Sequence, residues 1–193
     1  NLYKQESDKK LRSKFVNRNE FIITHISNFR KVKRVNDVIK VFQKVNQVIP
    51  SKLLMIGDGP ERIIAEQLCR DIAIDDEVEF LGKLRVIENI LAISDVFLLT
   101  SQTESFGLVA LEAMASRTAI VSTNSGGISE VNIEGKTGFL SKVGDIDKMA
   151  ADMIVLLEDQ ELLTNFKMNA LEHAKSFSLA NILPKYNAIY QSL

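Results

Sequence analysis

The chain contains very little cysteine. Its 193 residues include one cysteine, Cys69, and a single thiol cannot form an intramolecular disulfide or a cysteine-based metal cluster. Cys69 falls within the apolar pattern of an expected helix. A protein with this cysteine usage fits a reducing compartment, so the expected location is cytoplasmic.

Long apolar runs and an excess of charge of one sign are also missing. No run approaches the roughly 18 apolar residues of a membrane span, and residues 1–18 are too polar for a signal peptide. The 24 basic and 25 acidic side chains leave a formal net charge of −1. This balance does not favour a general surface for nucleic acid or anionic lipid. The missing initial Met leads us to expect a fragment of a longer protein.

The apolar residues are arranged as short strands that alternate with helices. Each of five apolar runs is followed by a turn signal and a helical pattern, which predicts a parallel sheet. Because the runs are unbroken, helices should cover both sheet faces. The sequence therefore predicts an α/β fold, a Rossmann-like three-layer sandwich. The runs are Ile22–Ile26, Leu53–Ile56, Val78–Leu81, Val96–Leu99 and Ala119–Val121.

The helical patterns give the expected domain organisation. A helix should begin near Val35 and end before Pro50. Pro60 is expected at the first position of the next helix, whose buried face should consist of Ile63, Ile64, Leu68 and Ile72. From Ile146 onward, successive helices without an intervening strand are expected. We predict a charged entry segment or interdomain connection over residues 1–19, a Rossmann-like domain over 20–177 and a further helix over 178–193.

The turn after the fourth run is the leading candidate for a ligand site. Ligands of open α/β sheets bind beyond the carboxyl ends of the strands, near helix starts that attract anions. Glu104 lies in this turn and Glu112 about two helical turns later, so both could contact one hydroxyl-rich ligand. Gly107 would permit a close approach to the helix-start amides. From spacing alone, two ordinary surface carboxylates remain an open alternative.

The turn after the first run carries the cations Arg30, Lys31, Lys33 and Arg34. Cations at this place could neutralise phosphates, although a solvated basic loop is an equal alternative. The Gly57–Pro60 turn lacks both the dinucleotide fingerprint and the P-loop lysine, so we interpret it as structural. The absence of that fingerprint after the first strand also argues against a dinucleotide-dependent oxidoreductase.

The sequence also contains a pair of adjacent glycines and two isolated histidines. Gly126 and Gly127 open an expected helix, where they could face a ligand or relieve backbone crowding. His25 and His173 have no companions at zinc-ligand spacing, and we interpret both as structural.

The segment Glu104–Ala115 resembles the Glu-x7-Glu signature of retaining GT-B glycosyltransferases of group 1, the GT4 family. The resemblance extends over about residues 20–190 and implies the C-terminal, donor-binding half of a GT-B fold. It also implies that the helix over 178–193 packs toward an N-terminal domain of the same parent chain. The surrounding motifs occur in the family's order: Phe80–Lys83, Ser94–Val96, Gly126–Glu130 and Gly135–Leu140.

The resemblance implies a role for each candidate residue. Lys33 and Glu104 become candidate catalytic residues, with Lys33 on the phosphates and Glu104 on the donor sugar hydroxyls. Glu112 would bind the ribose hydroxyls, and the backbone near Leu84 would read a uracil base. The remaining donor-binding candidates are Ser27, Asn28, Arg30, Ser105, Phe106, Gly107 and Leu108. No metal or other cofactor is implied.

The stretch Ser27–Arg34 resembles one bacterial subgroup of this family, the N-acetylglucosaminyl L-malate synthases of bacillithiol formation. The implied donor is UDP-N-acetylglucosamine and the implied acceptor is L-malate. The acceptor site would lie on the N-terminal domain, so the isolated chain should bind nucleotide but transfer little sugar. A noncatalytic nucleotide-sugar-binding or regulatory module is the alternative. The sequence does not indicate an oligomeric state.

The sequence departs from the family pattern at three positions. Asn28 stands where many members carry an arginine that touches phosphate, and Arg30 could compensate for it. Ser129 replaces a common proline. Arg117 replaces the usual glycine at a helix end, which would cost about 1 kcal/mol if its backbone is left-handed.

Overall fold

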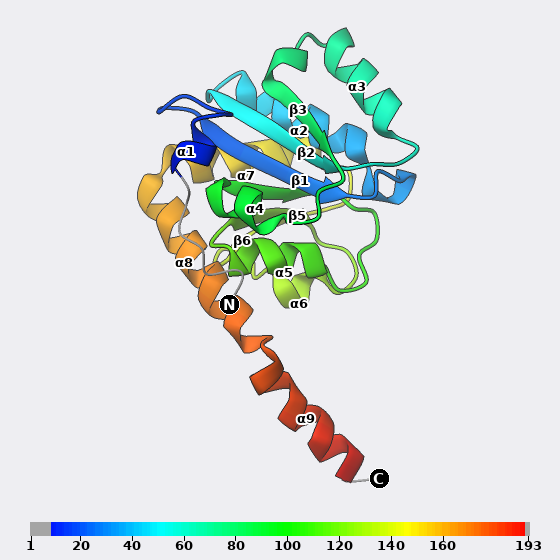
Figure 1. Cartoon of the computed structure of the whole chain (residues 1–193), viewed down its shortest axis with the longest axis vertical. Coiled ribbons are helices and arrows are strands. Elements are labelled where there is room, and N and C mark those ends of the chain that lie inside the picture. The colour runs from blue at the N-terminus through cyan, green and yellow to red at the C-terminus, as the bar shows by residue number, and fades with distance from the viewer. Residues whose placement is uncertain (1–8, 192–193) are drawn as a thin grey trace.

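The computed structural model describes residues 9–191, apart from the side chains of residues 185–189 and 191. The first eight residues of the predicted interdomain connection and the last two of the chain therefore lie outside the description. Six parallel strands form one sheet in the order β3-β2-β1-β4-β5-β6 (Figure 1). The strands are β1 (Phe21–Ser27), β2 (Ser51–Gly57), β3 (Val78–Gly82), β4 (Val96–Leu99), β5 (Ala119–Thr123) and β6 (Gly138–Ser141).

Helices cover both faces of the sheet, which confirms the predicted three-layer α/β sandwich. One buried cluster joins the sheet to α2, α3 and α7, and a second joins it to α4, α5 and α6. Helix α8 contributes to both clusters. The α-helices are α1 (Lys9–Arg12), α2 (Val35–Asn46), α3 (Arg62–Asp71), α4 (Glu88–Ile93), α5 (Leu108–Ala115), α6 (Ile128–Val131), α7 (Ile146–Glu158), α8 (Gln160–Ser176) and α9 (Leu179–Gln191). Short 3₁₀ helices are η2 (Lys31–Lys33) and η3 (Asp75–Glu77).

All five predicted strands are present, and the prediction missed a sixth. Strand β6 has four residues and begins with Gly138, so it carries neither the length nor the β-branched content of a strand signal. Gly138 is required there, because a Cβ atom would lie 1.8 Å from the Ile120 carbonyl oxygen of the neighbouring strand.

The predicted buried face of α3 was partly wrong. Ile63 and Ile64 are 76% and 50% exposed, whereas Ala65 and Cys69 are buried. The buried positions follow the i, i+4 spacing of a narrow helix face. Pro60 lies two residues before the first residue of α3 rather than at its first position.

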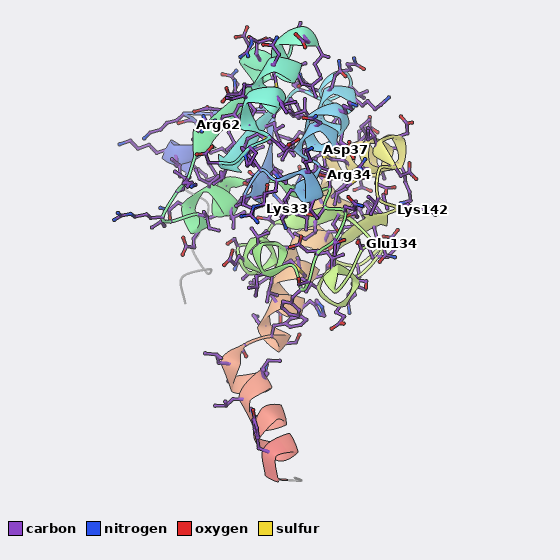
Figure 2. All side chains as sticks on the ribbon, turned by 90° about the vertical axis from the view of Figure 1, so that its right-hand side faces the viewer. Lys33, Arg34, Asp37, Arg62, Glu134 and Lys142 are labelled. Atoms are coloured by element: carbon purple, nitrogen blue, oxygen red, sulfur yellow. The ribbon has the colours of Figure 1, made fainter. Side chains whose placement is uncertain are left out.

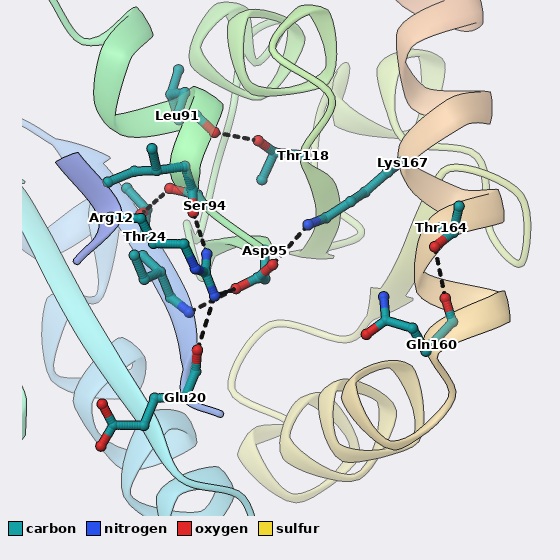
Figure 3. Close-up of polar contacts among 12 residues, drawn as sticks. Arg12, Glu20, Thr24, Leu91, Ser94, Asp95, Thr118, Gln160, Thr164 and Lys167 are labelled. Atoms are coloured by element: carbon teal, nitrogen blue, oxygen red, sulfur yellow. Dashed lines mark hydrogen bonds and ion pairs between the residues drawn. The ribbon is translucent and has the colours of Figure 1, made fainter. Parts of the chain in front are cut away.

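A buried carboxylate connects several elements at the amino edge of the sheet (Figure 3). Asp95 accepts hydrogen bonds from Arg12 at 2.7 Å, from Lys167 at 2.8 Å and from the Ile22 amide at 2.9 Å. Arg12 also donates to the Ile93 and Glu20 carbonyl oxygens. Asp95 thereby joins the end of α1, the start of β1 and helix α8.

Helix α9 extends away from the body of the molecule (Figure 1). Its described side chains include Leu179, Leu183 and Tyr190, which are 82%, 57% and 73% exposed. In the described part of the chain, no helix combines the length and apolar character needed to cross a membrane.

Candidate functional site

The strand order places the candidate site at a reversal of the chain's path across the sheet. Strands β1 and β4 are neighbours, and successive strands lead outward from each of them in opposite directions. Loops that leave the carboxyl ends of two such strands diverge, and the crevice between them is where sheets of this kind bind ligands. Both polar turns identified in the sequence begin there, the first after Ser27 and the second after Leu99.

Lys33 and Glu104 meet across this crevice. The ammonium of Lys33, a residue labelled in Figure 2, lies 2.6 Å from a Glu104 carboxylate oxygen, although the residues are 71 positions apart in the sequence. Their side chains are only 19% and 12% exposed. Partial burial strengthens the attraction between opposite charges relative to a fully solvated pair. The structure therefore brings the two candidate catalytic residues into direct contact.

Hydrogen bonds to backbone carbonyl oxygens hold the two loops against one another. The Thr100 hydroxyl donates to the carbonyl oxygens of Lys33 and Arg34, at 3.0 and 3.1 Å. The Gln102 amide donates to the Val32 carbonyl oxygen at 2.8 Å. These bonds place the loop that carries Lys33 beside the loop that carries Glu104 before any ligand arrives, so the site is preorganised.

The paired glycines after β5 allow the Glu104 loop to pack closely. A Cβ atom on Gly126 would lie 1.9 Å from the Glu104 carbonyl oxygen, and one on Gly127 would lie 2.4 Å from the Ser105 carbonyl oxygen. The Gly127 amide donates to the Glu104 carbonyl oxygen at 2.9 Å. Of the two interpretations of this pair, relief of backbone crowding is the one that the contacts support.

Helix α5 begins within the site. Gly107, at φ 85°, precedes its first residue, and no side chain caps the helix. The first amides of a helix have no acceptor inside it and carry partial positive charge. Phe106 is half-buried, while Ser105 and Leu108 are exposed. The donor-binding roles predicted for Ser105, Phe106, Gly107 and Leu108 remain predictions.

Glu112 lies further along α5 and is half-buried. Burial raises its pKa above the ordinary value of 4.5, and the negative charge of Glu88 on α4 raises it further. One Glu88 carboxylate oxygen is itself buried without a hydrogen-bond partner. Glu112 is therefore an acceptor whose charged form is disfavoured until hydroxyl or amide donors reach it.

The other predicted donor-binding residues lie at the end of β1 and in the loops that follow β1 and β3. Asn28 and Arg30 are exposed on the loop that carries Lys33, and Leu84 is 37% exposed in the loop after β3. Ser27 ends β1, and its hydroxyl is hydrogen-bonded to His25. The roles predicted for these four residues remain predictions.

Two supporting features were not predicted as parts of the site. A Cβ atom on Gly57 would lie 1.8 Å from the Ser27 carbonyl oxygen, and one on Gly59 would lie 2.1 Å from that of Asn28. The Gly57–Pro60 turn is thus structural, as expected, and it supports the first site loop. His25 lies directly before that loop and is buried. One of its partners, the Leu98 carbonyl oxygen, lies 73 positions away in the sequence, so no local motif predicts that hydrogen bond.

Within residues 9–191, no group of three or more His, Cys, Asp and Glu residues is arranged to hold a metal ion. The positive charge near Glu104 comes from Lys33.

Comparisons with known proteins identify the class. Residues 6–173 match the family described as glycosyl transferases group 1. The match covers most of the chain, and the chain belongs to this family. The chain spans less than half the length of the curated relatives described next.

Individual relatives agree with this class. The chain is 46% identical over 176 residues to the N-acetyl-alpha-D-glucosaminyl L-malate synthase of Bacillus anthracis, covering 91% of this chain and 46% of that protein. It is 35% identical over 177 residues to the trehalose synthase of Thermococcus litoralis, covering 86% and 42%. The crystal structure of Anabaena HepE in complex with UDP superposes with a TM-score of 0.88 at 25% identity, covering 100% of this chain and 55% of that one.

Proposed function

We propose that the chain is the donor-binding half of a retaining glycosyltransferase, with UDP-N-acetylglucosamine as donor and L-malate as acceptor. The observation that carries the proposal is the ion pair of Lys33 and Glu104, 2.6 Å apart at the carboxyl ends of β1 and β4. Nucleotides bind sheets of this order at that edge. The similarity to the Bacillus anthracis synthase supports the choice of sugar and acceptor.

The donor would replace the internal ion pair with two new contacts. Lys33 would turn from Glu104 to the diphosphate, and Glu104 would then accept hydrogen bonds from the sugar hydroxyls. Glu112 would accept them from the ribose hydroxyls. Asn28 and Arg30 would lie beside the phosphates, on the same loop as Lys33.

In the proposed reaction, the bond between the sugar C1 and the UDP oxygen breaks, and its electron pair stays on UDP. The acceptor hydroxyl oxygen forms a new bond to C1 with retained configuration, and its proton passes to the diphosphate oxygen that has left C1. Lys33 and the first amides of α5 would stabilise the charge that develops on the leaving diphosphate. We propose that no metal ion is needed for this charge stabilisation.

The acceptor site and the remaining catalytic groups would lie on an N-terminal half of the same parent protein. The support for this is that the chain covers 46% of the Bacillus anthracis relative. Two substrates must be held together for the transfer. The isolated chain should therefore bind UDP and transfer little sugar.

The proposal is tested first by calorimetric titration of the chain with UDP. Lys33→Met should weaken binding by at least about 10-fold, because a charge-assisted contact to phosphate is lost. Lys52→Met is the matched control, since Lys52 lies near the amino end of β2, at the opposite edge of the sheet. The proposal fails if the unsubstituted chain does not bind UDP or if both variants bind it equally well.

A second experiment separates the enzyme from a noncatalytic binding module. The chain is joined to its N-terminal half, and release of UDP is measured with UDP-N-acetylglucosamine and L-malate, with and without a metal chelator. Transfer that resists the chelator is the expected result. UDP binding without turnover of any donor and acceptor in a panel would favour the binding module.

A further inference from the structure

His25 has only one way to make its observed hydrogen bonds in the neutral form. Its Nδ1 atom lies 2.9 Å from the Leu98 carbonyl oxygen, and its Nε2 atom lies 2.9 Å from the Ser27 hydroxyl. A carbonyl oxygen only accepts, so Nδ1 carries the proton. The Nε2 atom then has only a lone pair, and the Ser27 hydroxyl donates to it. Burial lowers the pKa of His25 to about 4, with a smaller lowering from the Lys33 charge, so the ring is neutral at pH 7.

The Ser27 hydroxyl is thereby turned inward. Its proton is used by His25, and its oxygen also accepts from the Phe29 amide at 3.3 Å. A diphosphate offers only acceptor atoms to a neutral hydroxyl. Ser27 therefore cannot donate to the phosphates while it is bonded to His25, in contrast to the donor-binding role that the family resemblance implies.

The Phe29 backbone needs the support that Ser27 gives. Phe29 has φ 39°, in the left-handed region that bulky residues rarely adopt. Its ring is completely buried, stacked on His25 with centroids 6.2 Å apart and edge-on to Phe80 at 6.3 Å. The Glu61 amide donates to its carbonyl oxygen at 2.9 Å. Contacts to the amide, the ring and the carbonyl oxygen of Phe29 therefore hold the strained turn in place.

The turn leads directly into the segment that carries Lys33. Residues Lys31–Lys33 form η2, and the Lys33 amide donates to the Arg30 carbonyl oxygen at 2.8 Å. The position of this short helix depends on where the chain leaves Phe29. The Lys33 side chain then reaches Glu104.

We propose that His25 is a positioning residue for the donor site: its one tautomer fixes the Ser27–Phe29 turn and so determines where Lys33 stands relative to Glu104 and an incoming diphosphate. This inference rests on the proposed function for its ligand. Its structural part concerns the unoccupied chain and can be tested separately. His25 is completely buried and acts through Ser27 without touching the ligand.

The first test is spectroscopic. The ¹⁵N signals of the His25 ring at neutral pH should show a protonated Nδ1 and an unprotonated Nε2. A protonated Nε2 would overturn the proposal, because the Ser27 hydroxyl would then be free to point toward the crevice. This measurement needs no ligand and no substitution.

The second test uses a double-mutant cycle with UDP titration. His25→Asn retains a donor near Nδ1 but cannot reach Ser27, and Ser27→Ala removes the hydroxyl. Each should weaken UDP binding by about 5-fold, which corresponds to one hydrogen bond of about 1 kcal/mol. The double variant should be no weaker than either single variant, since both remove one unit. Ser27→Thr should restore affinity.

Thr24→Val is the matched control for lost stability. Thr24 is the neighbour of His25 in β1, and its hydroxyl is bonded to Ser94 at 2.6 Å, away from the site loop. This variant should lower the melting temperature without changing UDP affinity. If Ser27 bound phosphate directly, Ser27→Ala would weaken binding while His25→Asn would not, and the proposal would be overturned.

Failure of the proposed function gives a different result. If the unsubstituted chain does not bind UDP, the donor assignment fails. The positioning role is then tested by the NMR signals of the backbone amides of residues 30–33. They should shift in Ser27→Ala and remain unchanged in Thr24→Val. Unchanged signals in Ser27→Ala would overturn the positioning role, even where His25→Asn does not fold.

Discussion

At the scale of single residues, Glu104 has two opposing effects on a nucleotide ligand. It pairs with Lys33 at 2.6 Å, so it competes with the diphosphate for the same ammonium group. Glu104→Gln keeps the size of the side chain and removes its charge. We expect UDP to bind about 5-fold more tightly to this variant, a gain of about 1 kcal/mol, as calorimetry would measure.

The same substitution should have the opposite effect on sugar transfer. In the chain joined to its N-terminal half, Glu104→Gln should lower turnover of the UDP-sugar, because an amide is a weaker acceptor for sugar hydroxyls than a carboxylate. Glu134→Gln is the control for a surface carboxylate outside the crevice and should change neither quantity (Figure 2). Weaker UDP binding in Glu104→Gln would contradict the competition between Glu104 and the diphosphate.

At the scale of secondary structure, α5 ends in a motif that favours glycine but carries Arg117. The Arg117 amide donates to Met114 and the Thr118 amide to Ala113, each at 3.0 Å, which is the bonding pattern of a Schellman motif. Arg117 has φ 62°, so its backbone is in the left-handed conformation. We expect Arg117→Gly to stabilise the chain by about 0.5–1 kcal/mol, as the relieved backbone strain exceeds the entropy cost of glycine.

Chemical denaturation would measure this change. Arg117→Ala is the control, because it removes the same side chain contacts and keeps a Cβ atom in the left-handed conformation. It should give no gain in the free energy of unfolding. Equal stabilisation by Ala and Gly would mean that the long side chain, rather than the backbone, is the source of the effect.

The sequence was sufficient to predict elements that carry a long and regular pattern. The unbroken apolar runs predicted the covered parallel sheet, and the rule for strand ends identified the two turns that carry Lys33 and Glu104 as candidate sites. Strand β6 was missed because a short segment beginning with Gly138 has almost no strand signal. The face of α3 was misassigned because Ile63 and Ile64 satisfy the apolar pattern equally well while facing solvent.

Contacts between distant residues could not be predicted in the same way. His25 bonds to Leu98, which lies 73 positions later, and nothing in either segment specifies that pairing. The glycine pair at Gly126 gave two possible interpretations until its distance from the Glu104 carbonyl oxygen was known. The ligand roles of the site residues remain predictions, because they depend on a bound donor.

At the scale of the whole molecule, Asp95 joins elements from both ends of the described chain. Burial by itself raises its pKa, but the charges of Lys167 and Arg12 outweigh burial and hold the pKa below 3.8. Asp95→Asn retains an acceptor for the Ile22 amide and leaves two cations without their partner. We expect a loss of about 3 kcal/mol in the free energy of unfolding at pH 7.

The pH dependence gives this prediction a definite sign. A carboxyl group with a lowered pKa in the folded state stabilises that state above its unfolded pKa, and the stabilisation is lost as pH falls through the folded value. The difference between the original chain and Asp95→Asn should therefore be constant near neutrality and shrink below about pH 3.8. Denaturant titrations at several pH values would measure it, and a difference that grows on acidification would contradict the ion-pair account.

Helix α9 belongs to this scale because three of its described large apolar side chains, Leu179, Leu183 and Tyr190, are exposed. Leu179 and Leu183 are exposed there, so we propose that α9 packs toward the N-terminal half of the parent protein. Ending the chain after Phe177 should leave its melting temperature and UDP affinity unchanged. In the chain joined to its N-terminal half, the loss of α9 should reduce sugar transfer, because the two halves would no longer be held together.

A truncation one residue shorter provides the control for this prediction. The Phe177 ring lies edge-on to Phe106 at 5.7 Å and to His173 at 5.2 Å, so ending the chain after Ser176 removes contacts that α9 does not make. This shorter chain should melt at a lower temperature and bind UDP more weakly, because Phe106 supports the start of α5. If ending the chain after Phe177 destabilises the domain equally, α9 contributes to the folding of this half, and its exposed residues need another explanation.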